Sequence, residues 1–208
     1  MKVLLINGSP NAKGSTYTAL SEVASALNKE SIETEIFHVG KEPIRGCMAC
    51  RSCKTTNSGR CIFSDDTVNI ALEKAEEADA FVFGSPVHYA GASGMITSFL
   101  DRLFFAGTSF AYKPGAAIVC CRRGGATAAF EQLNKYFTIS QMPVVSSQYW
   151  NMVHGNNPEE VKQDLEGMQT MRTLGKNMAW LLKCIEAGKS AGVALPEKEP
   201  RAVTNFIR

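Results

Sequence analysis

The stretch Lys2-Val-Leu-Leu-Ile-Asn7, followed by the turn Gly8-Ser-Pro10, decides the fold of this chain. A continuous apolar run without alternation is typical of a parallel strand that is buried on both faces. Beyond the turn, apolar residues recur at helical spacing, at Leu20, Val23, Ala24 and Leu27. This part of the sequence therefore predicts a buried strand at 2–7 and an amphipathic helix at 15–29.

The same order, a strand followed by a helix, continues along the chain. We predict further strands at 32–39, 79–85, 115–121 and 142–146, and helices at about 66–78, 95–103, 126–137 and 157–185. The polar character of 32–39 and the internal Pro143 place the second and fifth strands at the edges of the sheet. Strands that alternate with helices predict an α/β fold with a doubly wound parallel sheet, strand order 2-1-3-4-5, and helices on both faces.

The last helix is marked by its start and by its apolar stripe. Asn157 and Pro158 favour a helix start, because Asn caps a helix and Pro suits its first turn. The stripe runs from Val161 to Ile185 and contains several methionines, which we assign to the core or to a subunit interface. The tail 188–208 holds two prolines and mixed charges, and we expect it to be extended. We expect one domain over 1–208, with a cysteine-rich loop at 41–63.

Composition narrows the class of protein. The chain has 208 residues, a formal net charge of +2 and 45% hydrophobic residues, so it can bury a sizeable core and gives no argument for nucleic-acid binding. No apolar run approaches the roughly 20 residues of a membrane span. Seven cysteines, an odd number, and the absence of a leader before the first strand argue against a secreted disulfide scaffold. We therefore expect a cytoplasmic protein without a membrane partner.

Four of the cysteines fall within one short segment: Cys47, Cys50, Cys53 and Cys61. Thiolates two residues apart can converge on one soft metal centre, and this spacing suits an iron–sulfur cluster. Three alternatives stay open, namely a zinc ion, a redox-active dithiol, and a loop without metal. The other cysteines, Cys120, Cys121 and Cys184, lie in strand or helix patterns and are assigned to buried packing.

Three further segments each follow a predicted strand. The carboxyl ends of these three strands would border one crevice. Gly8–Thr16 is rich in small and hydroxyl residues and opens a helix, which suits phosphate binding or an ordinary turn. Gly84–Gly91 carries His88 and Tyr89, which could lie against a flat ring or serve only as surface residues. Arg122–Gly125 offers backbone donors and two positive charges for an anionic ring or a nucleotide phosphate, or is simply a solvated helix start.

Together these segments resemble the flavodoxin-like NAD(P)H-dependent FMN reductase family. The resemblance rests on Ile6-Asn-Gly-Ser-Pro10, Gly14-Ser-Thr16, Phe83-Gly-Ser-Pro-Val-His-Tyr-Ala-Gly91, Met95 through Asp101-Arg102, and Arg123-Gly-Gly125, over roughly the first 150 residues. It implies a flavodoxin-like sheet and bound FMN. The implied phosphate residues are Ser9, Asn11, Gly14, Ser15 and Thr16. The implied ring residues are Pro86, Val87, His88, Tyr89 and Gly91, with Arg122, Arg123, Gly124 and Gly125 at the far edge of the ring. Many relatives carry a basic residue in place of Asn11, and Lys13 could take over that charge.

The cysteine segment is similar to that of the iron–sulfur flavoproteins, which hold a [4Fe–4S] cluster beside FMN. This resemblance implies an oxidoreductase that takes electrons from NAD(P)H and passes them to a small acceptor or a redox protein. Two other functions stay open: an FMN electron-transfer protein without substrate turnover, and a thiol- or metal-based redox sensor. The aromatic segment Tyr149–Gly155 could cover the flavin, in this or a neighbouring subunit, or form a contact between subunits, which we favour. This segment and the methionine-rich helix favour a homodimer or homotetramer.

Overall fold

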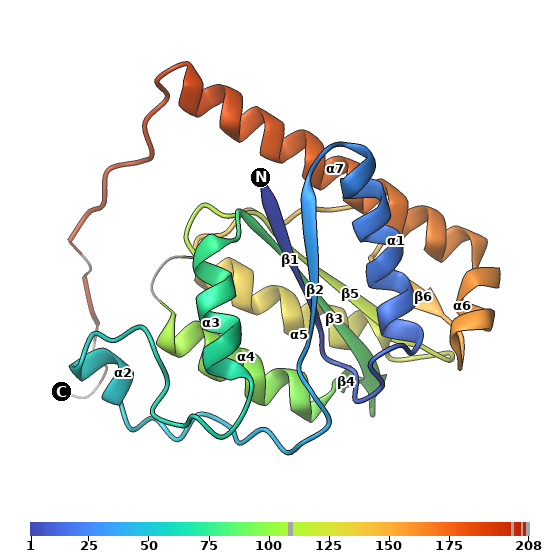
Figure 1. Cartoon of the computed structure of the whole chain (residues 1–208), viewed down its shortest axis with the longest axis horizontal. Helices are drawn as coiled ribbons and strands as arrows, with labels where there is room; N and C mark the ends of the chain where they lie inside the picture. Colours follow the sequence, from blue (N-terminus) through green and yellow to red (C-terminus); the bar gives the residue numbers. More distant parts are fainter. Residues whose placement is uncertain (108–109, 201, 205, 207–208) are drawn as a thin grey trace.

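A computed structural model describes residues 1–107, 110–200, 202–204 and 206. In chain order its elements are β1 (Lys2–Asn7), α1 (Ser15–Lys29), β2 (Glu33–His38), α2 (Ser52–Thr55), α3 (Val68–Glu77), β3 (Ala80–His88), β4 (Gly91–Ala92), α4 (Gly94–Ala106), β5 (Gly115–Cys121), α5 (Ala126–Ile139), β6 (Met152–His154), α6 (Pro158–Gln163) and α7 (Leu165–Ser190). Figure 1 shows the strands at the centre and α7 running along one side.

The parallel strands of the described residues are ordered β2-β1-β3-β5-β6, which confirms the predicted 2-1-3-4-5 order of a flavodoxin-like sheet. β1 is an inner strand, paired in register with the edge strand β2 on one side and with the central strand β3 on the other. The short β4 folds back antiparallel on the end of β3. The inner position of β1 could be predicted from the sequence, because a continuous apolar strand needs neighbours on both edges and both faces.

Helices cover both faces of the sheet, as predicted. Side chains of one face, such as Leu5 and Val82, pack with α1, α6 and α7. Side chains of the other face, such as Ile6 and Phe83, pack with α3, α4 and α5. Successive residues of a strand point to opposite faces, so each central strand contributes to both apolar clusters. The core therefore holds the carboxyl ends of β1, β3 and β5 rigidly in place.

The predicted fifth strand at 142–146 was misplaced. Only Val144 there forms an isolated parallel bridge, to Gly115, and the strand that completes the edge of the sheet is β6. Between the two, the chain leaves the sheet, because the Ser147 hydroxyl donates to the Thr170 carbonyl and the Asn177 amide donates to the Ser146 carbonyl. These bonds to α7 hold the polar segment away from β5. The chain returns to β5 at residue 152.

The predicted long helix is two helices that meet at Asp164. Asn157 caps α6 as predicted, and its side chain accepts a hydrogen bond from the backbone N–H of Glu160. The Asp164 carboxylate accepts from the Gly167 N–H and starts α7. The methionine stripe belongs to the core, where α7 packs against α1, although Leu165 is exposed. Helix α7 runs to Ser190, two residues past the expected start of the tail at 188.

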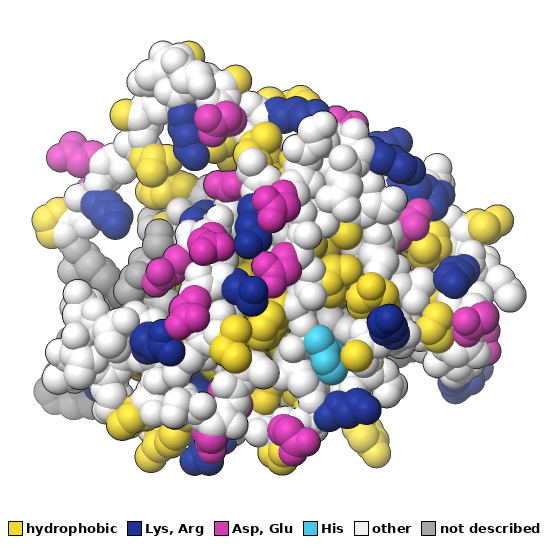
Figure 2. Space-filling model, viewed as in Figure 1, with side chains coloured by type: hydrophobic (Ala, Val, Ile, Leu, Met, Phe, Trp, Pro, Cys, Tyr) yellow, Lys and Arg dark blue, Asp and Glu magenta, His cyan; other side chains and the backbone are white. Residues whose placement is uncertain are grey.

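Acidic and basic side chains alternate on the face shown in Figure 2. Glu35 on the edge strand β2 lies between two lysines, 3.2 Å from Lys2 Nζ and 2.6 Å from Lys74 Nζ. The hydrogen bond from Lys74 is the main reason why the pKa of Glu35 is lowered. Within the described residues, no helix has the length and apolar character needed to cross a membrane.

Candidate functional site

The carboxyl ends of β1, β3 and β5 lie at one edge of the sheet, and each strand continues into a loop. Asn7 at the end of β1 stands in register with Gly84 of β3, and the Gly8 N–H donates to the Gly84 carbonyl at 2.9 Å. Ligands of open parallel sheets bind in the crevice outside this edge. The topology therefore makes neighbours of the three predicted flavin segments, Gly8–Thr16, Gly84–Gly91 and Arg122–Gly125, whose parts outside helices and strands are residues 8–14, 89–90 and 122–125 (Figure 1).

The first loop is ordered by its own side chains. Asn7 is fully buried; its Oδ1 accepts from the Ser9 N–H at 3.1 Å, and its Nδ2 donates to the Ala12 carbonyl at 3.1 Å. The Ser9 hydroxyl accepts from the Asn11 N–H at 3.1 Å. Ser9 and Asn11, both predicted phosphate residues, are thus tied together by the loop itself. No role was predicted for Asn7, although a polar residue that ends an apolar strand is a usable signal.

His38 at the end of β2 supports the same loop from the side. Its Nε2 lies 2.8 Å from the Ser9 carbonyl oxygen. Because a carbonyl can only accept, the proton of this bond must be on Nε2. The sequence prediction did not include His38. The predicted pairing of β2 with β1 would have suggested it, since His38 stands in register with Asn7.

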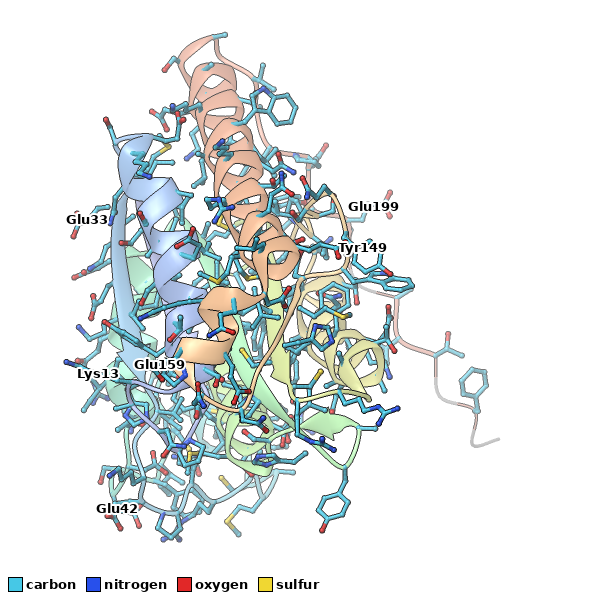
Figure 3. All side chains as sticks on the ribbon, turned by 90° about the vertical axis from the view of Figure 1, so that its right-hand side faces the viewer. Lys13, Glu33, Glu42, Tyr149, Glu159 and Glu199 are labelled. Atoms are coloured by element: carbon cyan, nitrogen blue, oxygen red, sulfur yellow. The ribbon has the colours of Figure 1, made fainter. Side chains whose placement is uncertain are left out.

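Helix α1 begins at this loop with unpaired backbone donors. Its N-cap is Gly14, which has no side chain to accept from the first turn, and within the described helix that turn holds no acidic residue. Uncapped N–H groups at the positive end of a helix suit a phosphate. Ser15 is half-buried, whereas Thr16 is buried. Figure 3 shows Lys13 in the loop just before the helix.

The second loop is a tight hairpin between β3 and β4. β3 extends to His88, three residues past the predicted end, and His88 pairs with Gly91. At the tip, Tyr89 and Ala90 have φ values of 49° and 59°, and the Tyr89 side chain is fully exposed. The hairpin is held from α5, where the Gln132 Oε1 accepts from the Ala92 N–H at 2.9 Å. Pro86 and Val87 are half-buried beneath it, and His88 is exposed.

The third loop approaches the second so closely that it requires glycine. Gly125 has a φ of 86°, and a Cβ there would lie 2.7 Å from the Ala90 Cα. Gly125 is also the N-cap of α5 and offers no capping side chain, so the first turn of α5 starts without a side-chain cap at the same edge of the sheet as that of α1. Arg122, Arg123 and Gly124 are exposed beside it.

Two serines that the sequence prediction left out join the first two loops. The Ser93 hydroxyl, which caps α4, donates to the Gly8 carbonyl at 2.9 Å, and the Ser93 N–H donates to the Ser85 hydroxyl at 2.9 Å. Both serines are buried. Rigid loops, uncapped helix starts and glycines at close approaches are what a phosphate and a flat ring require. The residues at this edge therefore fit FMN.

The four clustered cysteines form a second site, on the segment between β2 and α3. All four line one pocket, together with Met48, Arg51, Ile62, Phe63, Arg102, Phe105 and Ala106. Cys53 is buried and Cys61 half-buried, whereas Cys47 and Cys50 are exposed. Within the described residues, no three His, Cys, Asp or Glu side chains stand close enough to hold a metal ion. The thiol set fits a thiolate-bound metal by its chemistry, although the outer two thiols would have to move inward.

The outer part of this segment is shaped by unusual backbone conformations. Ala49 and Arg51, on either side of Cys50, have φ values of 54° and 60°. The turn brings Ser52 back to Cys50, and hydrogen bonds from Ser52, the largest from its backbone N–H, lower the pKa of the Cys50 thiol. A lowered pKa favours the thiolate, which is the form that binds metals.

The three remaining cysteines are only partly as predicted. Cys120 and Cys121 are buried at the end of β5, as expected, and burial raises the pKa of Cys120 to about 12. Cys184 is exposed on α7, so its assignment to buried packing was wrong. The helical pattern placed it near the apolar stripe, but the stripe continues through Met178 and Leu182 on a different side of the helix.

The aromatic segment before β6 borders a separate pocket. Tyr149 and Trp150 are 55% and 52% exposed and pack edge to face, with ring centroids 5.1 Å apart. Thr127, His154 and Asp164 also line this pocket. Tyr149 and Glu42, which precedes the cysteines, lie on opposite sides of the view in Figure 3. The aromatic pair therefore does not belong to the cysteine pocket.

Comparisons with known proteins agree with this geometry. Residues 1–157 match the sequence profile of the family described as NADPH-dependent FMN reductase. An iron–sulfur flavoprotein of Methanocaldococcus jannaschii is 33% identical over 195 residues, which cover 89% of this chain and 100% of the relative. An iron–sulfur flavoprotein of Archaeoglobus fulgidus is 27% identical over 201 residues, which cover 87% of this chain and 97% of the relative.

Solved structures share the fold at much lower identity. A crystal structure of RosB with a bound riboflavin-phosphate intermediate superposes with a TM-score of 0.67 and 16% identity, over 100% of this chain and 94% of that one. At this identity the likeness concerns the fold alone.

Proposed function

The chain belongs to the NADPH-dependent FMN reductase family, and from that premise we propose that it is a redox flavoprotein that takes electrons from NADH or NADPH and passes them to a small acceptor or a redox protein. The observation that carries the proposal is the convergence of three ordered loops at the carboxyl edge of the sheet. Ser93 ties two of them together, and Gly125 packs the third against the hairpin. FMN, when bound, supplies the hydride-accepting ring.

The residues of the chain would then bind and orient. We assign the phosphate to the start of α1, with Ser9, Asn11, Gly14, Ser15 and Thr16. We assign the ring to the hairpin, with Pro86, Val87, His88, Tyr89 and Gly91. At the far edge of the ring we place Arg122, Arg123, Gly124 and Gly125. The positive charges of the two arginines favour an anion. Because Thr16 is buried, its backbone N–H and not its hydroxyl would serve the phosphate.

We further propose that Cys47, Cys50, Cys53 and Cys61 hold a [4Fe–4S] cluster. Support comes from the shared pocket, from the lowered pKa of Cys50, and from relatives that are named iron–sulfur flavoproteins. A zinc ion would use the same four thiolates. Exposed Tyr149 and Trp150 are suited to a contact between copies, and we expect a homodimer or homotetramer, which light scattering on the eluting protein would measure.

The test begins with anaerobic purification, an absorption spectrum, and iron and sulfide assays. We expect two resolved flavin bands, a broad shoulder from the cluster, and bleaching of the flavin bands by NADH or NADPH. Flavin that stays oxidised with both nucleotides would refute the reductase function and leave an electron-transfer protein. A colourless protein that holds zinc or a disulfide would favour a thiol-based sensor.

Two matched cysteine variants separate the cluster from the flavin. Cys53→Ser removes a buried thiol of the pocket, and Cys184→Ser removes an exposed thiol on α7. We expect Cys53→Ser to lose the shoulder, iron and sulfide while it keeps the flavin bands, and Cys184→Ser to lose nothing. Equal iron in the two variants would exclude the proposed ligand set.

A further inference from the structure

Arg102 on α4 is buried in the pocket of the four cysteines, with 1% of its surface exposed. Its Nη1 donates to the Asp66 carboxylate and, at 3.4 Å, to the Arg45 carbonyl. Its Nη2 donates to the Phe63 carbonyl at 3.2 Å. A buried guanidinium is costly unless its charge is paired and its donors are used. These contacts use both terminal nitrogens of the fork.

The remaining nitrogen of the guanidinium is directed at a sulfur. Arg102 Nε donates to the Cys61 Sγ at 3.3 Å. An arginine guanidinium keeps its positive charge at any ordinary pH. The guanidinium is therefore charged beside Cys61. A charged donor forms its strongest hydrogen bond when the sulfur is a thiolate.

Cys61 is held by its backbone as well as by its sulfur. The buried Asn69 on α3 accepts from the Cys61 N–H at 2.8 Å and donates to the Cys61 carbonyl at 3.0 Å. Asn69 also donates to the Phe63 carbonyl at 3.0 Å, which anchors the residues after Cys61. One cysteine of the set is thus fixed in both main chain and side chain before any metal binds.

The other cysteines are held to different degrees. Cys53 is buried, and its Sγ lies 4.0 Å from the Phe105 carbonyl of α4. Cys47 and Cys50 are exposed, beside the positive-φ residues Ala49 and Arg51. The pocket therefore has an inner half, Cys53 and Cys61, that contacts α4, and an outer half that is open to solvent. In Figure 1, α4 lies beneath α3, and the cysteine segment with α2 continues the same side of the molecule.

We propose that Arg102 is a positioning residue of the four-cysteine site, which holds Cys61 as the fixed ligand and supplies an internal positive charge to the bound metal. The inference rests on the metal site of the proposed function and deepens it. The ion pair with Asp66 and the bonds to the two carbonyls anchor the segment. The bond from Nε to sulfur uses the remaining donor of the buried guanidinium, and it is also the kind of contact that a metal ligand receives from its surroundings.

The experiment isolates the contact between Arg102 and Cys61. Removing Arg102 alone would leave the Asp66 carboxylate buried without a partner and could prevent folding. The test variant is therefore the double substitution Arg102→Met with Asp66→Asn, and its matched control is Asp66→Asn alone. Both lack the ion pair, and only the control keeps a guanidinium beside Cys61. Full-length FMN-bound proteins, stripped of iron and kept reduced, are titrated with Co²⁺ against a chromophoric chelator, and thiolate-to-cobalt absorption reports the ligands.

We expect the double variant to bind Co²⁺ about 10–100-fold more weakly than the control, the usual effect of losing a residue that orients a metal ligand. Equal affinities in the two variants would overturn the inference, because Arg102 would then only anchor the segment. A wild-type protein that gives no thiolate-to-cobalt absorption would overturn it together with the metal site. Arg102-dependent cobalt binding in a protein that never carries iron would support the inference and refute only the cluster.

A second readout is the reduction potential after reconstitution with iron and sulfide. Hydrogen bonds to the sulfurs and nearby positive charge stabilise the reduced, more negative cluster. We expect a lower potential in the double variant than in the control, a shift that loss of a structural anchor alone would not produce. Unchanged potentials would count against the proposed charge effect.

Discussion

Replacing Gly8 by alanine tests whether the first loop is as tightly seated on α4 as the structure indicates. A Cβ at residue 8 would lie 2.6 Å from the Ile96 Cβ, 2.7 Å from its Cγ1 and 2.8 Å from its Cδ1. Ordinary contacts begin at 3.4 Å, so the shortest contact falls 3.4 − 2.6 = 0.8 Å short. Ile96 is fully buried and cannot turn away, so either the loop or α4 must shift.

The expected cost follows from overpacking. Inserting a methyl group into a packed core costs about 1–3 kcal/mol. At about 2–4 °C per kcal/mol for a chain of this size, Gly8→Ala should melt about 2–12 °C below the wild type. FMN affinity should also fall about tenfold, which corresponds to roughly 1.4 kcal/mol of binding free energy, because the phosphate needs the loop in its unshifted position.

The assays are thermal unfolding followed by circular dichroism and FMN titration followed by quenching of flavin fluorescence. Gly94→Ala is the matched control for stability, since a Cβ there meets nothing within 4 Å and alanine favours the helix. The control should melt at or slightly above the wild-type temperature. If Gly8→Ala melted together with Gly94→Ala and bound FMN as tightly as the wild type, the close seating of the loop would be refuted.

Three further predictions concern neighbouring features. His38→Leu removes the donor to the Ser9 carbonyl, a bond worth about 0.5–1.5 kcal/mol, and should therefore weaken FMN binding about 2–12-fold. His38→Gln keeps a side-chain N–H donor and should recover part of this loss of affinity. Equal losses of affinity for the two variants in an FMN titration would contradict the role of the Nε2 proton. Asp164→Ala removes the acceptors of the Gly167 and His154 N–H groups and should lower the free energy of unfolding, measured with denaturant, by about 0.5–2 kcal/mol. The control Asp65→Ala loses only an exposed ion pair and should lower it by about 0–1 kcal/mol. Glu35 has its pKa lowered below 4.5 in the folded state, so it stabilises the fold above about pH 4.5 and loses this effect as the pH falls through the folded-state value. The wild type should therefore melt above Glu35→Gln at pH 7, and the gap should narrow below pH 4.5; a gap that stays constant would exclude the linkage.

Most elements of the sheet could be predicted because their information is local. The apolar run of β1 and the helical spacing of α1 follow from the chain itself, and so does the turn between them. β6 could not be predicted in this way. The candidate strand around Val144 is apolar, yet two hydrogen bonds to α7 draw the following residues away from the sheet. In one Ser147 donates to α7, and in the other Asn177 of α7 donates to the segment. Partners some 23 and 31 residues apart leave no local pattern.

The candidate sites divide in the same manner. Glycine, serine and arginine at the ends of strands were visible, because such residues stand out after an apolar run. The residues that hold these loops in place were not. His38 and Ser93 carry ordinary polar side chains, and their partners become apparent only when β2 and α4 lie beside the loop that follows β1, whereas Asn7 bonds within that loop.

The cysteine segment separates what the sequence predicts from what only the tertiary structure determines. The spacing alone predicted that four thiols can meet, because cysteines a few residues apart on one segment are able to converge on a single centre. Spacing could not tell which thiols are fixed. That depends on Arg102 and Asn69, which the packing of α4 and α3 places beside Cys61 from 41 and 8 residues away. Which thiols lie close together in the chain is a property of the sequence, whereas their positions and the charge beside them depend on the neighbours that the fold supplies.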